Sequence, residues 1–547
     1  MQDTTTLIYQ DIPQNKLQAK MLNNWSGMDA WVFFTIMLIL IASGVWLHAI
    51  GQNSGSFLIV LFEALMLLPL IVRLPKGYGR LYDEIVSGLR GEFRQQVLHG
   101  IWWRQEDTDS RFIRWLRYRH NKHGVIPLKL VQIQAKVDGE VQRFGVLRQL
   151  DRPFDHLYIR SRGGAFASVD ANRNHQAVTE LANITNLIIA QAGLKLGISY
   201  LRITGPCDET KPAQFLAENM NPLIAEPDLF DLDDDTRAWA DWLREDANQL
   251  RPTARTMGAS ETWYLIIITI KRSREWRRAS KGKLSDEQLN DLPIIELGRS
   301  MVEALDASTL LELEDVHCVG LAELSTLVRC AWDVAGIDSY YRDRAAGRIP
   351  RTDEDIDRIR NESGSAAVDA ALQTWPTTCI ETPATGDCIK VDGNYISTLR
   401  VTALPERVRA DQYLGLHYIG KAGSWNRMAM VGQSVSGNAE TRNLVIGQSA
   451  LVNLQAALFS NRVVQNPRWG NKRRKMADQA QEMSAHSISQ QFNQLHSAVA
   501  TSQRELKRNL RQLSAALNAD GFPNEVVKVP DRQLAALISG CLGINRL

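Results

Sequence analysis

A long apolar run at residues 30–50 constrains the fold of this chain more than any other feature. It contains no Asp, Glu, Lys or Arg, and Trp31 and Trp46 lie near its two ends. At about 1.5 Å of rise per helical residue the run would extend about 30 Å, which matches the hydrocarbon core of a bilayer. Tryptophan is typical of the two membrane interfaces. The run therefore predicts a transmembrane helix.

A second apolar run follows at residues 57–72, after a short uncharged connection at residues 51–56. Lys16 and Lys20 precede the pair, and basic residues from Arg73 to Arg94 follow it. Because positive charge is retained in the cytoplasm, we expect a two-helix hairpin in the plasma membrane with both termini cytosolic. The alternative is a cleaved signal peptide followed by a core helix. The sequence argues against this alternative, because the first run has neither a basic segment just upstream nor an Ala-x-Ala-like cleavage site.

Glu63 lies inside the second apolar run. A carboxylate at a helix centre costs about 2.5–3.5 kcal/mol on insertion scales, so it is seldom accidental. One interpretation is an intramembrane polar contact with a partner's helix. The other is a protonated or snorkelling side chain close to the interface.

The remainder of the chain predicts an α+β fold with two cytosolic α/β units, the second ferredoxin-like. Alternating residues 129–137 and 141–150 around Asp138-Gly139 predict a hairpin, and the β-branched run 262–270 predicts a central strand. Ser502 and Glu505 predict a helix start, followed by a leucine stripe on one helix face. The expected organisation is as follows: tail 1–27, transmembrane hairpin 28–76, basic juxtamembrane segment 77–125, first cytosolic domain 126–335, charged linker 336–385 and second cytosolic domain 386–547.

Composition excludes several classes of protein. A net charge of +2 argues against a globally basic protein that coats nucleic acid. None of the six cysteines forms a Cys-x-x-Cys pair, and no Cys/His group has zinc-finger spacing. We therefore expect reduced thiols in the cytosol and no bound metal.

Motifs that carry chemistry are missing from the sequence. Residues 432–437 have the glycine spacing of a phosphate loop, but Asn438 stands where its lysine would be. The chain contains neither His-Glu-x-x-His nor Gly-x-Ser-x-Gly. We therefore predict no catalytic, cofactor-binding or metal-binding residues, and a non-enzymatic role.

Two stretches combine basic and aromatic residues, which suits an anionic lipid surface, an acidic partner or nucleic acid. A solvated helix or loop would show the same composition. A third basic cluster, at residues 472–475, has no aromatic residue. The candidate binding residues are Arg111, Arg114, Trp115, Arg117, Arg119, Lys271, Arg272, Arg274, Trp276, Arg277 and Arg278.

Several segments resemble a group of actinobacterial integral membrane proteins associated with conjugative, type IV-like secretion loci. These segments are residues 321–333 (LAELSTLVRCAWD), 392–405 (DGNYISTLRVTALP), 499–521 and 533–543 (QLAALISGCLG). Proteins of that group pair an N-terminal membrane hairpin with a cytosolic region similar to the non-ATPase N-terminal half of conjugation ATPases. The chain departs from the family in an expanded region at residues 438–486. The resemblance implies no catalytic residues.

The resemblance implies a membrane-anchored structural component that tethers or regulates the motor ATPase at the channel. The implied partners are that ATPase, other membrane channel subunits and membrane lipid, within a multimeric complex. Two alternatives remain open. One is a core membrane component of type VII secretion, and the other is a membrane-tethered protein that binds DNA.

Overall fold

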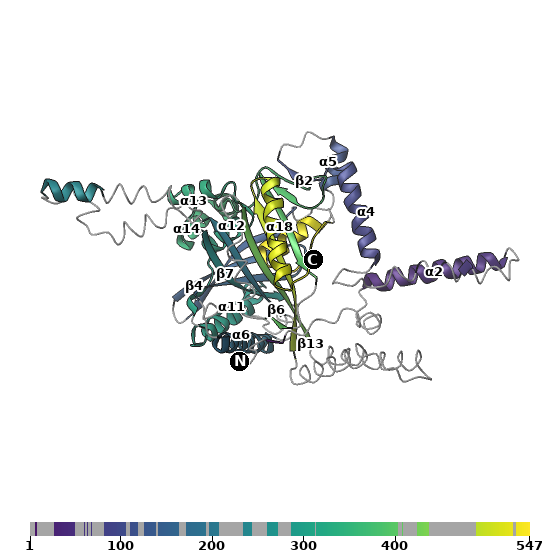
Figure 1. The fold of residues 1–547 in the computed structure, drawn as a ribbon, viewed down its shortest axis with the longest axis horizontal. Coiled ribbons are helices and arrows are strands. Elements are labelled where there is room, and N and C mark those ends of the chain that lie inside the picture. Colours follow the sequence, from purple (N-terminus) through teal and green to yellow (C-terminus); the bar gives the residue numbers. More distant parts are fainter. Residues whose placement is uncertain are drawn as a thin grey trace.

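A computed structural model gives the fold (Figure 1). It describes residues 6–7, 27–49, 59–60, 63, 67, 81–105, 110–118, 125–137, 140–163, 171–192, 196–206, 233–242, 260–271, 286–311, 313–402, 407–408, 424–436, 488–528 and 532–546.

The predicted transmembrane hairpin is wrong. Among the helices that the structure describes, none combines the length and the apolar character needed to cross a membrane. The first apolar run forms one helix, α2 (Gly27–Ala49), whereas the second run contributes only Ile59, Val60, Glu63 and Leu67 to the described chain. The described residues therefore contain no pair of bilayer-length helices. The predicted multi-pass location in the plasma membrane, with both termini cytosolic, is wrong for the same reason.

Within the described residues, a single antiparallel sheet of 13 strands dominates the fold. Its main path runs in the order β2-β9-β10-β11-β14-β13-β6-β7-β5-β4-β3, with β15 added to β11 and β8 to β5. The strands are β2 (Ile101–Arg104), β3 (Leu128–Val137), β4 (Glu140–Gln149), β5 (Phe154–Gly163), β6 (Leu196–Pro206), β7 (Ser260–Lys271), β8 (Leu313–Cys318), β9 (Cys379–Glu381), β10 (Ile389–Val391), β11 (Asn394–Val401), β13 (Ser424–Ser436), β14 (Ile488–Ala500) and β15 (Asn524–Val526). A separate two-stranded sheet pairs β1 (Thr6–Leu7) with β12 (Arg407–Val408).

The predicted pair of α/β units, the second ferredoxin-like, is also wrong. Strand β6 from the first expected unit pairs with β13 from the second, in the register Arg427↔Ile203 to Met430↔Tyr200. These main-chain hydrogen bonds join the strands of both units into one continuous sheet. The local patterns predicted the strands, but pairing between strands so far apart in the sequence leaves no local signal.

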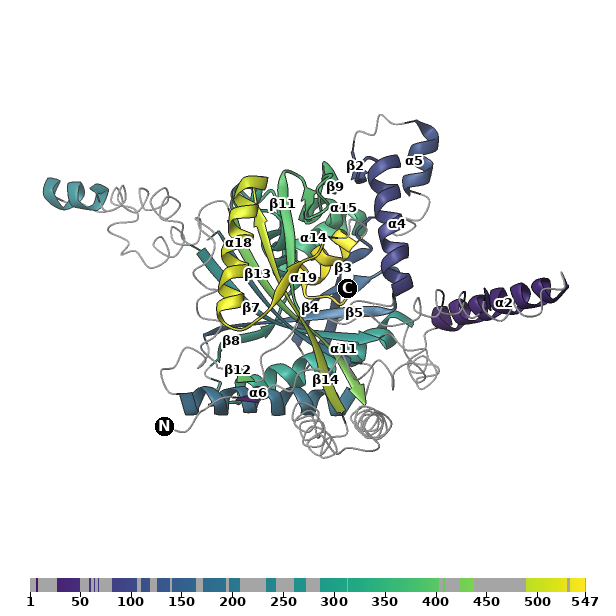
Figure 2. The same cartoon turned by 45° about the vertical axis from the view of Figure 1, so that its right-hand side comes forward.

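Helices cover both faces of this sheet (Figures 1 and 2). In β7, Ile266 and Ile268 belong to one hydrophobic cluster and Leu265 and Ile267 to another, as expected when successive side chains point to opposite faces. The first face carries α6 (Ala171–Ala192), α11 (Asp286–Asp306) and α18 (Gln503–Ala519). The opposite face carries α12 (Leu321–Trp332), α13 (Ile337–Ala345), α14 (Asp353–Ser363), α15 (Ser365–Leu372) and α19 (Gln533–Leu542).

Two glycines allow α19 and α12 to lie close to the strands. A Cβ atom on Gly540 of α19 would overlap Ser497 Oγ of β14, and one on Gly145 of β4 would lie 2.6 Å from the carbonyl oxygen of Gly320. Only glycine allows these approaches, because any side chain would displace the neighbouring element.

Candidate functional site

Helix α4 (Leu81–Val97) is attached to the sheet through its C-terminal half. Gln95 Nε2 donates to the main-chain oxygens of Thr382 and Pro383, at 3.1 and 3.3 Å. The Arg94 guanidinium lies 3.5 Å from the centre of the Trp102 ring, within the range of cation–π contacts. Trp102 in turn donates from Nε1 to Thr382 Oγ1 at 2.8 Å, so strand β2 and helix α4 share one anchor.

A tight turn fixes the direction in which the chain passes from the end of α4 into β2. His99 and Gly100 have φ angles of 53° and 72°, and the main-chain nitrogens of Leu98 and Gly100 both donate to the Arg94 oxygen. A Cβ atom on Gly100 would overlap the Thr382 oxygen, so a side chain cannot be accommodated there. This geometry ends the helix in the manner of a glycine C-cap.

Helix α4 also presents apolar side chains to solvent. Ile85, Leu89 and Phe93 are 43%, 67% and 47% exposed. Their spacing of four residues places them along one stripe of the helix. An amphipathic helix normally buries such a stripe against a core, so the exposure of this one makes it a candidate contact surface.

Helix α5 (Arg111–Tyr118) lies beside α4 in both views (Figures 1 and 2), and it too exposes large apolar side chains. The hydroxyl of Ser110 accepts the Ile113 main-chain N–H at 3.3 Å and caps the helix start. Phe112 and Trp115 stack with ring centroids 6.0 Å apart, and they are 64% and 51% exposed. We call the exposed side chains of Ile85, Leu89, Phe93, Phe112 and Trp115 the apolar surface.

The predicted binding residues divide between this region and residues outside the described chain. Arg111, Arg114, Trp115 and Arg117 all belong to α5, and Arg111 is exposed. Lys271 is exposed at the end of β7. Arg119, Arg272, Arg274, Trp276, Arg277 and Arg278 lie outside the described residues, as does the basic cluster at residues 472–475.

Glu63 finds a partner within its own chain. Ser43 Oγ on α2 donates to Glu63 Oε2 at 2.5 Å, so a serine of the first apolar run meets the carboxylate of the second. The predicted contact with a partner's membrane helix is not needed to explain this residue.

Sequence reasoning missed the α4 stripe and Phe112. Apolar residues recur four positions apart in residues 85–93, but such periodicity does not reveal whether the apolar side faces the chain's own core. The signal available in the sequence was the basic-aromatic character of α5, which follows α4 after a short interval.

Three cysteines and two histidines elsewhere in the described chain are held in uncharged forms by burial. Burial raises the pKa of Cys318 and of Cys388 to about 12 and that of Cys541 to about 11, so these thiols are protonated and weakly nucleophilic near neutral pH. Burial lowers the pKa of His156 and of His496 to about 3, so both rings are neutral. Across the described ranges, no three His, Cys, Asp or Glu residues are grouped so that they could hold a metal ion.

No protein-family model matches the chain, and no curated protein is detectably similar to it in sequence.

Proposed function

We propose that this chain is a non-enzymatic structural component of a conjugative, type IV-like secretion apparatus, and that it binds the motor ATPase through the apolar surface of α4 and α5. The observation that carries the proposal is the exposure of five large apolar side chains on two adjacent helices. Single exposed apolar residues are ordinary, but several of them spaced along one helix face and on its neighbouring helix favour a site of protein–protein contact.

The composition of the apolar surface suits recognition. Phe112 and Trp115 are rigid rings that already stack on each other, so little side-chain entropy is lost when a partner covers them. Aromatic and arginine side chains dominate the binding energy of protein interfaces, and Arg111 is exposed on the same helix. Because Gln95 and Arg94 fix α4 to the sheet, the surface is oriented before a partner arrives.

The secretion setting rests on the resemblance of residues 321–333 and 392–405 to the conjugation-associated family. In the fold these two short segments meet, since Asn394 Nδ2 donates to Asp333 Oδ1 at 2.8 Å. Their contact supports a shared structural role for the two motifs.

The test is affinity purification from the native host after in-cell crosslinking, with partners identified by mass spectrometry. The variant is Leu89→Asp combined with Phe93→Asp. Its control is Leu187→Asp, because Leu187 on α6 is likewise an exposed leucine, at 55%, in a helix away from α4. We expect the unaltered chain and the control to recover a conjugation-type ATPase, and the double variant to lose it.

Other recoveries would overturn the proposal. Recovery of type VII components, or of no secretion protein, would contradict the assignment to a type IV-like apparatus. Partners that disappear after nuclease treatment would indicate a DNA-binding protein instead.

A further inference from the structure

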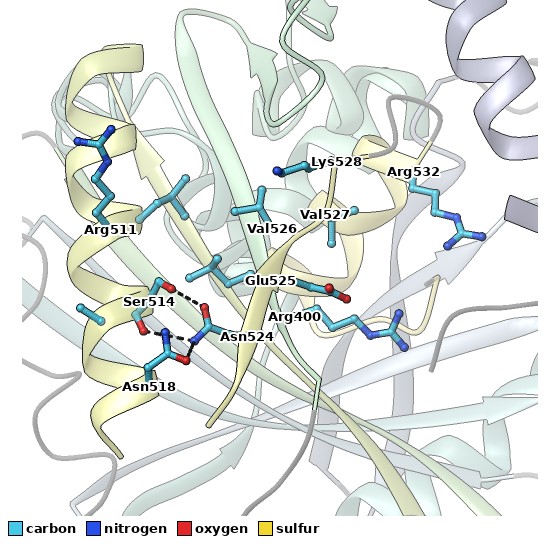
Figure 3. Close-up of a pocket in the computed structure, with 13 residues that line it drawn as sticks. Arg400, Arg511, Ser514, Asn518, Asn524, Glu525, Val526, Val527, Lys528 and Arg532 are labelled. Atoms are coloured by element: carbon cyan, nitrogen blue, oxygen red, sulfur yellow. Dashed lines mark hydrogen bonds between the residues drawn. The ribbon is translucent and has the colours of Figure 1, made fainter. Parts of the chain in front are cut away.

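A groove separates helix α18 from strand β15 (Figure 3). Its volume is about 670 Å³. One wall is a single face of α18, made by Leu510, Arg511, Ser514, Ala515 and Asn518. The other wall is the extended segment from Asn524 to Lys528. At about 3.3 Å per residue these five residues extend about 16 Å, which is the length of a short strand.

The wall formed by β15 is the edge of a sheet. Strand β15 pairs with β11 through Leu399↔Val526, Arg400↔Glu525 and Val401↔Asn524, and among the described strands it pairs with β11 alone. Val527 N donates to the Thr398 oxygen, and the Pro523 oxygen accepts from Thr402 N. Since main-chain groups alternate along an antiparallel strand, the N–H and C=O groups of Asn524 and Val526 point away from β11. Such an edge can accept a further strand.

Side-chain hydrogen bonds join the two walls at one end of the groove and fix the distance between them. Asn524 Oδ1 accepts from Ser514 Oγ at 2.7 Å, and Asn524 Nδ2 donates to the Asn518 Oδ1 atom at 3.3 Å. Figure 3 shows these three side chains converging between α18 and β15. The spacing between helix and strand edge is therefore built into the fold.

The excess of basic residues around the groove favours an acidic occupant. Four of the five charged residues that line it are basic: Arg400, Arg511, Lys528 and Arg532. The one carboxylate, Glu525, lies directly opposite Arg400 in the strand register. Arg511 and Lys528 are exposed on the two walls, so an occupant would meet positive charge from both sides.

From this combination we propose that the groove binds an extended acidic segment of a partner protein, which adds to β15 as the next antiparallel or parallel strand. Main-chain hydrogen bonds to the edge supply affinity, and acidic side chains at alternate positions meet Arg511 and Lys528. The site is separate from the apolar surface of α4 and α5, so it does not depend on the proposed function.

The test uses fluorescence anisotropy with the full chain and a labelled seven-residue peptide, Thr-Glu-Val-Glu-Thr-Glu-Val. We expect saturable binding that weakens with salt, and no binding of the same peptide with lysine in place of glutamate. The double variant Arg511→Glu and Lys528→Glu should raise Kd about tenfold or more. Its matched control, Arg504→Glu and Arg508→Glu, reverses two exposed charges of α18 that do not line the groove and should leave Kd unchanged.

N-methylation of the peptide backbone tests the strand addition without altering the protein. Methylation of one alternate set of peptide nitrogens should raise Kd about tenfold or more, whereas methylation of the other set should have little effect, because only one set faces β15. Equal effects of the two sets, or equal effects of the two double variants, would overturn the proposal. So would failure of the peptide to bind, or preferential binding of a single-stranded oligonucleotide that the Arg511→Glu and Lys528→Glu variant loses.

Discussion

Asp353 and Arg427 occupy opposite ends of helix α12. The Asp353 carboxylate accepts the main-chain N–H groups of Leu321 and Ala322, at 3.2 and 2.9 Å. The Arg427 guanidinium donates to the oxygens of Cys330 and Ala331, at 2.6 and 2.9 Å. The negative group lies at the helix N-terminus and the positive group at the C-terminus, which matches the helix dipole at both ends. Helix α12 is thereby tied to α14 and to β13.

Replacement of Arg427 by methionine tests the C-terminal tie. Arg427 is fully buried and also donates to the oxygens of Thr204, at 2.6 Å, and Asn426, at 3.4 Å, so Arg427→Met leaves four carbonyl oxygens without this donor. We expect the free energy of unfolding to fall by about 2–4 kcal/mol in urea titrations. The exposed residue Arg508 offers the control, since Arg508→Met should change it by less than about 0.5 kcal/mol. Similar losses in the two variants would contradict the role given to Arg427.

Asn394 supports the turn after α12. Its Oδ1 atom accepts the main-chain N–H groups of Val334 and Ala335, each at 2.8 Å, while its Nδ2 donates to Asp333. Asn394→Ala removes all of these bonds from a buried position, and we expect a loss of about 2–3 kcal/mol in the free energy of unfolding. Asn518→Ala, at an exposed position of α18, should cost less than half as much. An unfolding midpoint unchanged by Asn394→Ala would show that the turn does not need this side chain.

The His317–Glu323 pair predicts a pH dependence of stability. The hydrogen bond to Glu323, 3.0 Å from His317 Nε2, raises the pKa of His317 above its ordinary value. Burial opposes ionisation of Glu323, but hydrogen bonds from His317 and Arg160 outweigh it and lower the pKa of Glu323 to about 2. A raised histidine pKa stabilises the fold below the unfolded value of about 6.5 and is lost as pH rises through the folded value. A lowered carboxyl pKa stabilises the fold above about 4.5 and is lost as pH falls toward 2.

These two signs give Glu323→Gln a specific pH profile. The variant should lower the melting temperature most between about pH 4.5 and 6.5, with a smaller difference on either side. His317→Gln should lower the melting temperature mainly below about pH 6.5, with a loss that shrinks as pH rises. The decrease in stability toward acidic pH that depends on Glu323 should persist, because Arg160 still binds the carboxylate. Parallel profiles for the unaltered chain and Glu323→Gln would refute the linkage.

Gly145 and Gly88 form a matched pair for testing the close packing of α12. A Cβ atom at Gly145 would meet the Gly320 oxygen at 2.6 Å, whereas one at Gly88 of α4 would have no atom within 4 Å. We expect Gly145→Ala to lower the free energy of unfolding by about 1–3 kcal/mol and Gly88→Ala to raise it by up to about 1 kcal/mol. Thermal and urea unfolding would measure the expected decrease in stability of Gly145→Ala and the expected increase of Gly88→Ala. A neutral Gly145→Ala would mean that β4 and α12 can separate without cost.

Local patterns in the sequence predicted several elements correctly. Ser502 caps α18, with its hydroxyl accepting from Glu505 N at 3.3 Å. The leucine stripe of that helix is confirmed, since Leu506, Leu513 and Leu517 are buried. The expected hairpin is confirmed by the pairing of β3 with β4 from Leu128↔Gln149 to Val137↔Glu140. These features depend on neighbours in the sequence, so a single chain reveals them.

Contacts between residues far apart in the sequence could not be predicted from local patterns. Nothing in the local sequence indicates that the Arg427 guanidinium caps a helix almost a hundred positions earlier. The predicted membrane hairpin is wrong because it was inferred from the length and hydropathy of two apolar runs. Neither property shows which helices the folded chain forms. The candidate surface was predicted in part, through α5, because exposure of the α4 stripe depends on how the helix is docked.

Site-specific photocrosslinking at Leu89 tests the central claim most directly. A photoreactive amino acid replaces Leu89 in the full chain, and a second variant carries it at Leu187, an exposed leucine on α6. After irradiation in the native host, mass spectrometry identifies the crosslinked partner. The account predicts that position 89 crosslinks to a conjugation-type ATPase and that position 187 does not. Crosslinking of both positions to the same unrelated proteins, or of position 89 to none, would contradict it.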